Sequence, residues 1–390
     1  MELRALRRIL LALVGTGTVP PLEELGSADW AALNGLAVQH RLQPLLHAQH
    51  GSNAQIPPGN RLEWQRAHRR SALQAMAVRH ELTECVKVLE SAGIAPIALK
   101  GAWLAAHAYP APALRPMRDI DLLVPRAQVL DGYAVLQAAG YAELGPAEMP
   151  LEQVLRLDKH LPPLIAPRGT VIELHHRLWE PDGRLDHASP SGDTTTPTQT
   201  RRDDEGIAYL SPTDTLAHLI VHAVYSHRLD CGPLLLPDID YLLRAEPIDW
   251  PAFWQRARNE GWRSGARLVL ELVAQYRVDA PIDFTPDGGP PPPRDLIEAA
   301  PDLLLQDLDT RRSAGLAAAA IKAGPGKLLQ RLRGRRSAHG EAEVTRAMDH
   351  EGGLIGWAGS RAWRNLTELA RADVRRQSRQ LAALSTWLDQ

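Results

Sequence analysis

The stretch LKGAWLAAHAYPAPALRPMRDIDLLV, residues 99–124, decides the fold class that we expect for this chain. It ends in a short apolar run headed by two aspartates, Asp119 and Asp121. Side chains alternate between the two faces of a β-strand, so both aspartates should share one face while the apolar residues share the other. Neighbouring carboxylates repel each other unless a cation lies between them, and Mg²⁺ prefers oxygen ligands. The stretch therefore predicts a buried strand that carries a cation-binding acidic pair.

The segments on either side of this run alternate between strand and helix patterns. Three short apolar or β-branched runs predict strands, and two longer segments predict helices: IAPIALKG (94–101), IDLLV (120–124) and TVIELHH (170–176) for the strands, AWLAAHAY (102–109) and AQVLDGYAVLQAAG (127–140) for the helices. Such alternation indicates an α/β unit. We therefore predict a small α/β core with a mixed sheet at residues 93–180, within a chain that is α-rich and of the α+β class.

The rest of the chain is mostly helical in its periodicity. Residues 181–206 lack periodicity and are rich in Ser, Thr, Asp, Gly and Pro, which predicts a flexible loop. Consecutive prolines favour an extended backbone, so residues 286–295 predict a stiff linker. The other expected regions are an N-terminal helical region (1–92), a helical region packed on the core (207–285) and a basic C-terminal helical region (296–390).

Composition and charge narrow the cellular location and the binding partners that we expect. The chain has 44 Lys+Arg against 46 Asp+Glu, so its average charge gives no attraction to nucleic acid or membrane. Its two cysteines, Cys85 and Cys231, are too few for a disulfide scaffold, which favours a reducing cytoplasm. The apolar stretch at residues 9–14 is too short to span a membrane, and its leucines recur at helical spacing. We therefore expect a cytoplasmic protein that begins with an amphipathic helix.

The C-terminal region departs from this average charge. Residues 311–380 hold fifteen Lys or Arg against six Asp or Glu, and six of the basic residues lie within Lys322–Arg336. A solvated helical face is the ordinary explanation for such a segment. The functional alternative is that the basic helices bind a polyanion or an acidic peptide.

Glu173, in the run VIELHH, is the candidate for a third carboxylate beside the acidic pair. A glutamate on a neighbouring strand would complete an oxygen-rich site that keeps positions for substrate oxygens. An isolated Asp-x-Asp pattern is weak evidence, because it is common at solvated strand ends and turns. The interpretation depends on the whole set, in which a Lys-Gly turn at Lys100, then Arg115, the two aspartates and Glu173 follow in order.

Three motifs together, LKG (99–101), an arginine followed by DIDLLV (119–124), and IELHHRL (172–178), resemble a bacterial family of uncharacterised nucleotidyltransferases. This family is a branch of the DNA polymerase β-like superfamily. Helical segments before and after the core are also similar, so the resemblance covers residues 1–275. It implies transfer of a nucleoside monophosphate from an NTP such as ATP to an acceptor, with Mg²⁺, or alternatively Mn²⁺, as the metal. The implied acceptor is a small molecule, a sugar or a peptide.

The resemblance also implies roles for individual residues. Asp119, Asp121 and Glu173 would hold the metal ions, and Glu173 would bind the ion that activates the acceptor. The residues that would meet the nucleotide phosphates are Lys100, Gly101, Arg115 and Arg118. The chain departs from the wider superfamily at Ala102, where a Gly or Ser usually follows the first glycine. The missing hydroxyl removes one phosphate contact.

Other polar residues near these motifs have two interpretations each. His175 should share a strand face with Glu173, and we expect it either to contact substrate or to form hydrogen bonds in the sheet. Asp238, in a second Asp-x-Asp pattern with Asp240, is expected to cap a helix or to contact the substrate. His218 and His222 lie one helical turn apart, but no glutamate stands between them as in HExxH metal sites, so we favour structural packing for both.

Two other functions stay open at this point. A nucleotide-sugar-dependent glycosyltransferase also uses an Asp-x-Asp pattern for its metal. Such folds begin with the nucleotide-binding unit, however, whereas here a long helical region comes first and Glu173 would have no role. The second alternative is an inactive nucleotide-binding or partner-binding module. Ala102 favours this module mildly, and the intact set of three acids argues against it.

Overall fold

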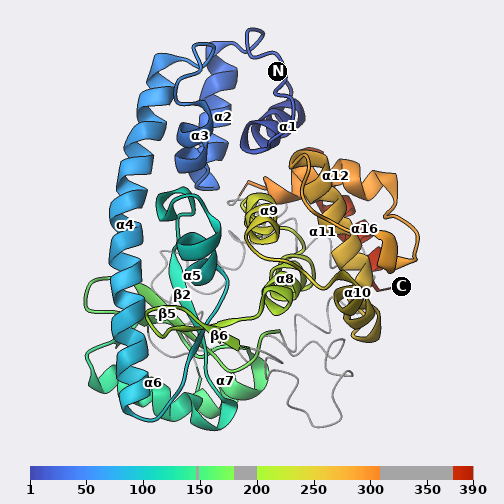
Figure 1. The fold of residues 1–390 in the computed structure, drawn as a ribbon. Helices are drawn as coiled ribbons and strands as arrows, with labels where there is room; N and C mark the ends of the chain where they lie inside the picture. The colour runs from blue at the N-terminus through green and yellow to red at the C-terminus, as the bar shows by residue number, and fades with distance from the viewer. Residues whose placement is uncertain (146–148, 180–199, 308–371, 390) are drawn as a thin grey trace, which may run out of the picture. The chain divides into compact units, whose positions relative to one another are not determined.

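The computed structural model describes residues 1–145, 149–179, 200–307 and 372–389 (Figure 1). The chain divides into two compact units: Met1–His227 with Pro233–Pro292, and Arg228–Gly232 with Pro293–Gln390. The first unit contains the sheet and the residues that the sequence predicts to bind metal and nucleotide. Across the described ranges, no helix has both the length and the apolar character needed to cross a membrane.

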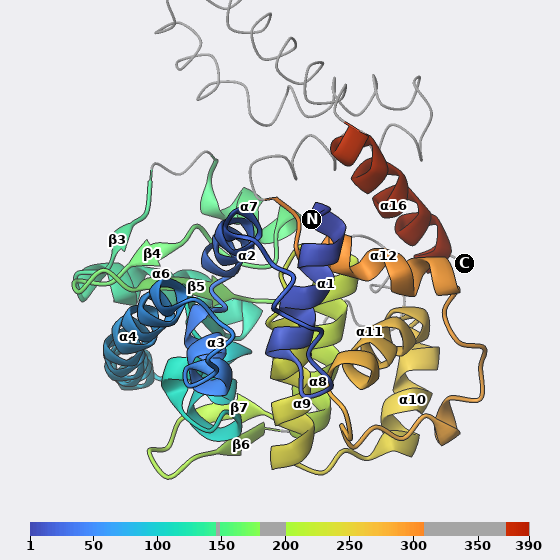
Figure 2. The same ribbon diagram turned by 90° about the horizontal axis from the view of Figure 1, so that it is seen from above.

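A mixed seven-stranded sheet forms the core of the first unit, in the order β3-β4-β5-β2-β1-β7-β6. Its strands are β1 (Ile97–Ala98), β2 (Asp119–Leu123), β3 (Ala142–Glu143), β4 (Leu164–Ile165), β5 (Val171–His175), β6 (Thr200–Arg202) and β7 (Ala208–Leu210). β2 runs parallel to β5 and antiparallel to β1, and β1 runs parallel to β7. Figure 2 shows β3 and β4 at one end of the sheet and β6 and β7 at the other. This mixed sheet among helices confirms the predicted fold class.

The central strands β2 and β5 carry the apolar core of the sheet on one face. Ile120, Leu122 and Ile172 are completely buried, as expected for apolar and β-branched side chains in a covered sheet. The parallel register places Asp119 opposite Val171 and Asp121 opposite Glu173. Because residues in register on neighbouring strands point to the same face, the acidic side chains of both strands gather on the other face.

Helix α6 (Val129–Ala138) packs against β5 and against the long helix α4 (Pro58–Ser91). Gly132 eases the packing on α4, because a Cβ there would lie 3.3 Å from Leu89 Cδ2. The segment after β1, predicted as one helix, is a short α5 (Gly101–Trp103) that continues as a π-helical turn over Leu104–Ala108. Turns of π-helix are rare in proteins, and those that occur often lie at functional sites.

The N-terminal helical region is linked to the segment that precedes β2. Its helices are α1 (Leu3–Val14), α2 (Ser27–Gln39), α3 (Gln43–His50) and α4. Three of its side chains, Arg41, Ser71 and Gln74, donate hydrogen bonds to backbone carbonyls of residues 113–117. These bonds join the N-terminal helices directly to the segment that carries the predicted phosphate-facing arginines.

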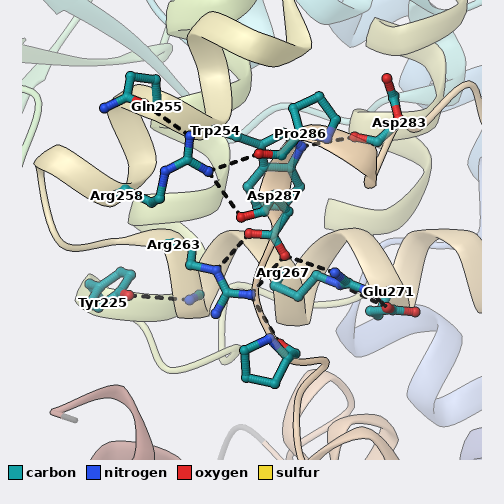
Figure 3. A network of polar contacts seen from close by, with 12 residues as sticks. Tyr225, Trp254, Gln255, Arg258, Arg263, Arg267, Glu271, Asp283, Pro286 and Asp287 are labelled. Atoms are coloured by element: carbon teal, nitrogen blue, oxygen red, sulfur yellow. Dashed lines mark hydrogen bonds and ion pairs between the residues drawn. The ribbon is translucent and has the colours of Figure 1, made fainter.

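The helices after the sheet are α8 (Pro212–Val221), α9 (Leu235–Ala245), α10 (Trp250–Asn259) and α11 (Arg263–Tyr276); the shorter α7 (Leu151–Leu157) lies between β3 and β4 in the sequence. The carboxylate of Asp287, completely buried, receives hydrogen bonds from Arg263 and Arg267 of α11 (Figure 3). Arg258 of α10 donates to the Asp287 carbonyl at 3.0 Å. The start of the segment predicted as a linker is therefore fixed to α10 and α11.

Two predicted regions lie partly outside the described residues, and one of them also differs from its prediction. Residues 200–202 of the expected loop form β6, which pairs antiparallel with β7, whereas residues 180–199 lie outside the described residues. In the second unit, α12 (Arg294–Leu304) contacts α16 (Ala372–Leu388), and Gln380 Nε2 donates to Asp302 Oδ2 at 3.1 Å. The basic run Lys322–Arg336, the candidate polyanion site, also lies outside the described residues.

Candidate active site

The acidic residues predicted from the sequence meet on β2 and β5. One oxygen each of Asp121 and Glu173 and one ring nitrogen of His175 lie within 4.8 Å of one another. Asp119 is two residues before Asp121 on the same strand face, but it is not a member of this close group. We call Asp119, Asp121, Glu173 and His175 together the acidic cluster.

His175 belongs to the acidic cluster rather than to the hydrogen bonds of the sheet alone. Its side chain is completely buried, with Nε2 2.9 Å from Asp121 Oδ1 and 3.5 Å from Glu173 Oε2. Burial by itself would lower the pKa of His175, but the hydrogen bonds with Asp121 and Glu173 outweigh it and raise this pKa. The imidazole therefore offers a positive charge or a nitrogen ligand between two carboxylates.

Lys100 neutralises part of the negative charge of the acidic cluster. Its Nζ lies 3.0 Å from Asp121 Oδ2, and both side chains are largely buried. Burial raises the pKa of Asp121, but Lys100 and the hydrogen bond with His175 outweigh it and hold this pKa well below its usual value. Lys100 also has a positive φ of 43° with ψ −112°, a backbone conformation that a lysine rarely adopts. Such strain is typical of functional sites.

Asp119 has less compensation than Asp121. Burial, followed by the charges of Asp121 and Glu173, raises the pKa of Asp119 above its usual value. The charges of Lys100 and Arg41 oppose this effect only in part. A divalent cation fits the donor set of the acidic cluster, because carboxylate oxygens suit Mg²⁺ and Mn²⁺ and a neutral imidazole nitrogen also suits the transition metal.

Arg115, predicted to meet phosphate, forms an ion pair inside the protein. Its Nε and Nη2 each lie 2.8 Å from an Asp238 oxygen, and Tyr109 donates its hydroxyl to Asp238 Oδ1 at 2.6 Å. Asp238 lies within α9 and does not cap it. A Cβ on Gly101 would lie 2.1 Å from Arg115 Nη1, so glycine is needed there for the guanidinium to pack on the backbone. This is a reason for Gly101 that sequence patterns did not reveal.

The other candidate residues occupy distinct places. Arg118 is exposed and immediately precedes β2. Asp240 is completely buried and pairs with Arg277 and Arg244, so it is a structural residue of α9. His160 Nε2 lies 3.8 Å from Glu173 Oε2, at the margin of the acidic cluster.

His218 and His222 pack inside the first unit. The His218 ring makes edge contacts with Trp179 and with His222, at centroid distances of 5.7 and 6.1 Å. Burial, followed by the charge of Lys100, holds the pKa values of both histidines well below 6.5. Within the described residues, neither joins two other metal-ligating side chains in a close group. Their geometry is that of neutral, packed histidines, as we favoured from the sequence.

Sequence reasoning missed Arg41 and Tyr109. Arg41 Nη1 donates to the Pro116 carbonyl at 3.2 Å, and Arg41 lies close enough to Arg118, Arg115 and Asp119 for their charges to change its pKa. Both missed residues reach the site across long separations, 75 residues from Arg41 to Pro116 and 129 from Tyr109 to Asp238. No local motif marks such contacts.

Comparison with known proteins identifies the family of this chain. No match was found among the curated proteins or among the solved structures. The family model described as uncharacterised nucleotidyltransferase matches residues 26–277, which is more than half of the chain. The match runs from α2 to the end of α11 and includes the whole sheet and the acidic cluster. The chain belongs to this uncharacterised nucleotidyltransferase family.

Proposed function

We propose that this protein transfers a nucleoside monophosphate from an NTP to a small-molecule, sugar or peptide acceptor, with a divalent metal bound at the acidic cluster. The observation that carries the proposal is the parallel register that sets Asp121 opposite Glu173, with Asp119 on the same face. Membership of a nucleotidyltransferase family supports it. In this reaction the acceptor oxygen bonds to the α-phosphorus, the bond from the α-phosphorus to the bridging oxygen breaks, and pyrophosphate leaves.

The metal would be held by Asp119, Asp121 and Glu173, with His175 as an additional ligand. The close group of Asp121, Glu173 and His175 supports this assignment, as does the excess of carboxylates over basic groups around Asp119. Mg²⁺, or alternatively Mn²⁺, would supply charge neutralisation for the triphosphate and activation of the acceptor oxygen. Glu173 would accept the proton that the acceptor hydroxyl loses.

The basic residues would position the nucleotide phosphates. Lys100 now neutralises Asp121, and with a divalent cation at the carboxylates its ammonium would be available to a phosphate oxygen. Arg118 is exposed beside the acidic cluster and can reach an anion in solution. Arg115 has its Nε and Nη2 engaged by Asp238, so Nη1, next to Gly101, is its one nitrogen that does not bond to Asp238. Arg115 would therefore act mainly by fixing the loop before β2.

We place this reaction in the cytoplasm, where NTPs are made and used. The two cysteines, Cys85 buried and Cys231 partly exposed, are not joined by a disulfide in the structure, which agrees with a reducing compartment. The run of basic residues at Lys322–Arg336 remains the proposed contact for a polyanion or an acidic peptide, on the basis of its charge alone.

The experiment that tests this function uses NTPs labelled at either the α- or the γ-phosphate, with cell extract as the acceptor source. Nucleotidyl transfer predicts that the α-label enters a product while the γ-label leaves as pyrophosphate, and that both events need Mg²⁺ or Mn²⁺. Transfer of the γ-label to a product would indicate a kinase. Transfer only from a labelled UDP-sugar would indicate the glycosyltransferase. Equal background from wild type and Asp121→Asn would indicate an inactive module.

A further inference from the structure

The loop before β2 is held by side chains of the N-terminal helical region. Ser71 Oγ donates to the Ala113 carbonyl at 2.7 Å, and Gln74 Nε2 donates to the Met117 carbonyl at 2.9 Å. Between these two bonds, Arg41 Nη1 donates to the Pro116 carbonyl at 3.2 Å. The loop carries Arg115 and Arg118 and runs directly into Asp119, so these three bonds set the position of one side of the site.

Arg41 differs from the other two tethers because it brings a charge. Arg41 lies in the turn between α2 and α3, where its backbone has a positive φ of 57°. The Nε atom is buried and has no hydrogen-bond partner in the part of the chain that the structure describes. Within the described ranges, the Pro116 carbonyl is the hydrogen-bond acceptor of Arg41, and no carboxylate pairs with this guanidinium. A mostly buried cation without a counter-charge costs free energy, which a bound anion would offset.

The neighbours of Arg41 make this cost larger. Burial, followed by the positive charges of Arg118 and Arg115, lowers the pKa of Arg41 to about 10, and the carboxylates of Asp119 and Asp238 only partly oppose this effect. Arg115 is neutralised by its own ion pair with Asp238. Arg41 and Arg118 are therefore two guanidiniums near enough for the charge of one to act on the other, and neither forms an ion pair with a carboxylate among the described residues.

We propose that Arg41 binds the polyphosphate of the nucleotide, together with Arg118, and so makes the N-terminal helical region part of the nucleotide site. This inference rests on the proposed function and deepens it. A guanidinium presents several N–H donors in a fixed plane, which suits phosphate oxygens, and Arg41 uses only one donor on Pro116. A polyphosphate carries several negative charges and can therefore form ion pairs with both arginines. A neutral acceptor would not offset their repulsion.

The alternative is that Arg41 only fixes the loop, as Ser71 and Gln74 do. The two roles separate experimentally, because Gln74→Ala removes a tether without removing a charge. Arg69→Gln removes a positive charge from an exposed position of α4 and removes no tether. Arg41→Lys keeps the charge and loses the planar guanidinium. These three variants are matched controls for Arg41→Gln.

The test is calorimetric titration of the full-length variants with each NTP and with inorganic tripolyphosphate, in Mg²⁺ buffer. We expect Arg41→Gln to raise Kd by about 10- to 100-fold for both probes, as the loss of a charge-assisted hydrogen bond implies. Arg41→Lys should lose less affinity than Arg41→Gln, Gln74→Ala should lose less than about threefold, and Arg69→Gln should match wild type. Because Arg41→Gln removes a positive charge, it should also reduce the salt dependence of binding.

Two results would overturn the inference. If Arg41→Gln and Gln74→Ala weaken binding equally, the role of Arg41 is to hold the loop, and the proposed function is unaffected. If wild type binds no polyphosphate, the inference and the proposed function fail together. Circular dichroism of each variant checks the fold. Should Arg41→Gln unfold, the comparison of Arg41→Lys with wild type decides, because equal Kd values for tripolyphosphate would then refute a guanidinium-specific contact.

Discussion

The acidic cluster on β2 and β5 and the buried Asp287 are both groups of charged side chains, but their charges balance differently. Asp287 is one carboxylate that accepts hydrogen bonds from two arginines, Arg263 and Arg267. The acidic cluster has three carboxylates and one histidine, with Lys100 paired to Asp121 and the charge of Arg41 acting on Asp119. Asp119 has a raised pKa because of burial and the two other acids, whereas the Asp287 carboxylate is surrounded by donors.

This difference separates a structural ion pair from a candidate active site. A buried charge that is fully paired holds two segments of a protein together. Here the hydrogen bonds to Asp287 hold the residues before the proline run against α11. A group of like charges without full compensation lowers stability, and a protein retains it where a ligand completes the balance. Arg41 likewise has a positive charge that the nearby carboxylates of Asp119 and Asp238 compensate only in part.

The largest effect is expected for Asp121→Asn. This change removes the carboxylate that lies against Lys100, His175 and Glu173, and with it a metal ligand, so transfer activity should fall about 1,000-fold. Pyrophosphate release in the presence of saturating NTP measures it. The exposed Asp131→Asn on α6 is the control and should keep full activity. Retention of more than a tenth of the wild-type rate in Asp121→Asn would remove the acidic cluster from the mechanism.

Asp287→Asn should have the opposite profile. It breaks a buried pair, so we expect a loss of about 3 kcal/mol in the free energy of unfolding, with activity per folded molecule retained. Urea unfolding of the full-length chain measures the loss. Glu84→Gln disrupts the exposed pair with Lys87 and should leave stability unchanged. The comparison fails if Asp287→Asn unfolds no more easily than Glu84→Gln.

The buried histidines predict that stability falls at acidic pH. His218 and His222 have pKa values held well below 6.5, so they stay neutral in the folded chain, while in the unfolded chain they gain protons as the pH falls through about 6.5. Each therefore reduces stability by up to about 1.4 kcal/mol per pH unit below that value. His218→Leu should flatten the pH dependence between 7 and 5. The exposed His80→Gln should not, and an equal effect of both changes would contradict the assignment.

The smallest expected effect is a gain in stability. The raised pKa of Asp119 means that its charge is disfavoured in the folded chain, so Asp119→Asn should raise the melting temperature slightly at pH 7. Thermal melting in EDTA measures this change, because a bound cation would mask it. The same variant should lose activity. A lower melting temperature in EDTA would show that Asp119 is compensated after all.

The central strands and their acids could be predicted because their evidence is local. IDLLV and VIELH have the apolar and β-branched pattern of buried strands, and alternation alone places Asp119 and Asp121 on one face. β1 lies within the predicted run 94–101, although only Ile97–Ala98 form the strand, whereas the two-residue strands β3 and β4 are too short to show a period. The Arg115–Asp238 pair joins residues 123 apart, and the π-helical turn at 104–108 has the composition of an ordinary helix. Such features depend on tertiary contacts that local patterns do not encode.

The measurement that tests the central claim most directly is binding of Mn²⁺ to the full-length chain, followed by electron paramagnetic resonance without nucleotide. The account predicts a site in the wild type that Asp121→Asn and Glu173→Gln each weaken by at least about tenfold. His175→Gln should weaken it less, and Asp131→Asn should leave it unchanged. Wild-type affinity in both Asp121→Asn and Glu173→Gln would contradict a metal site at the acidic cluster.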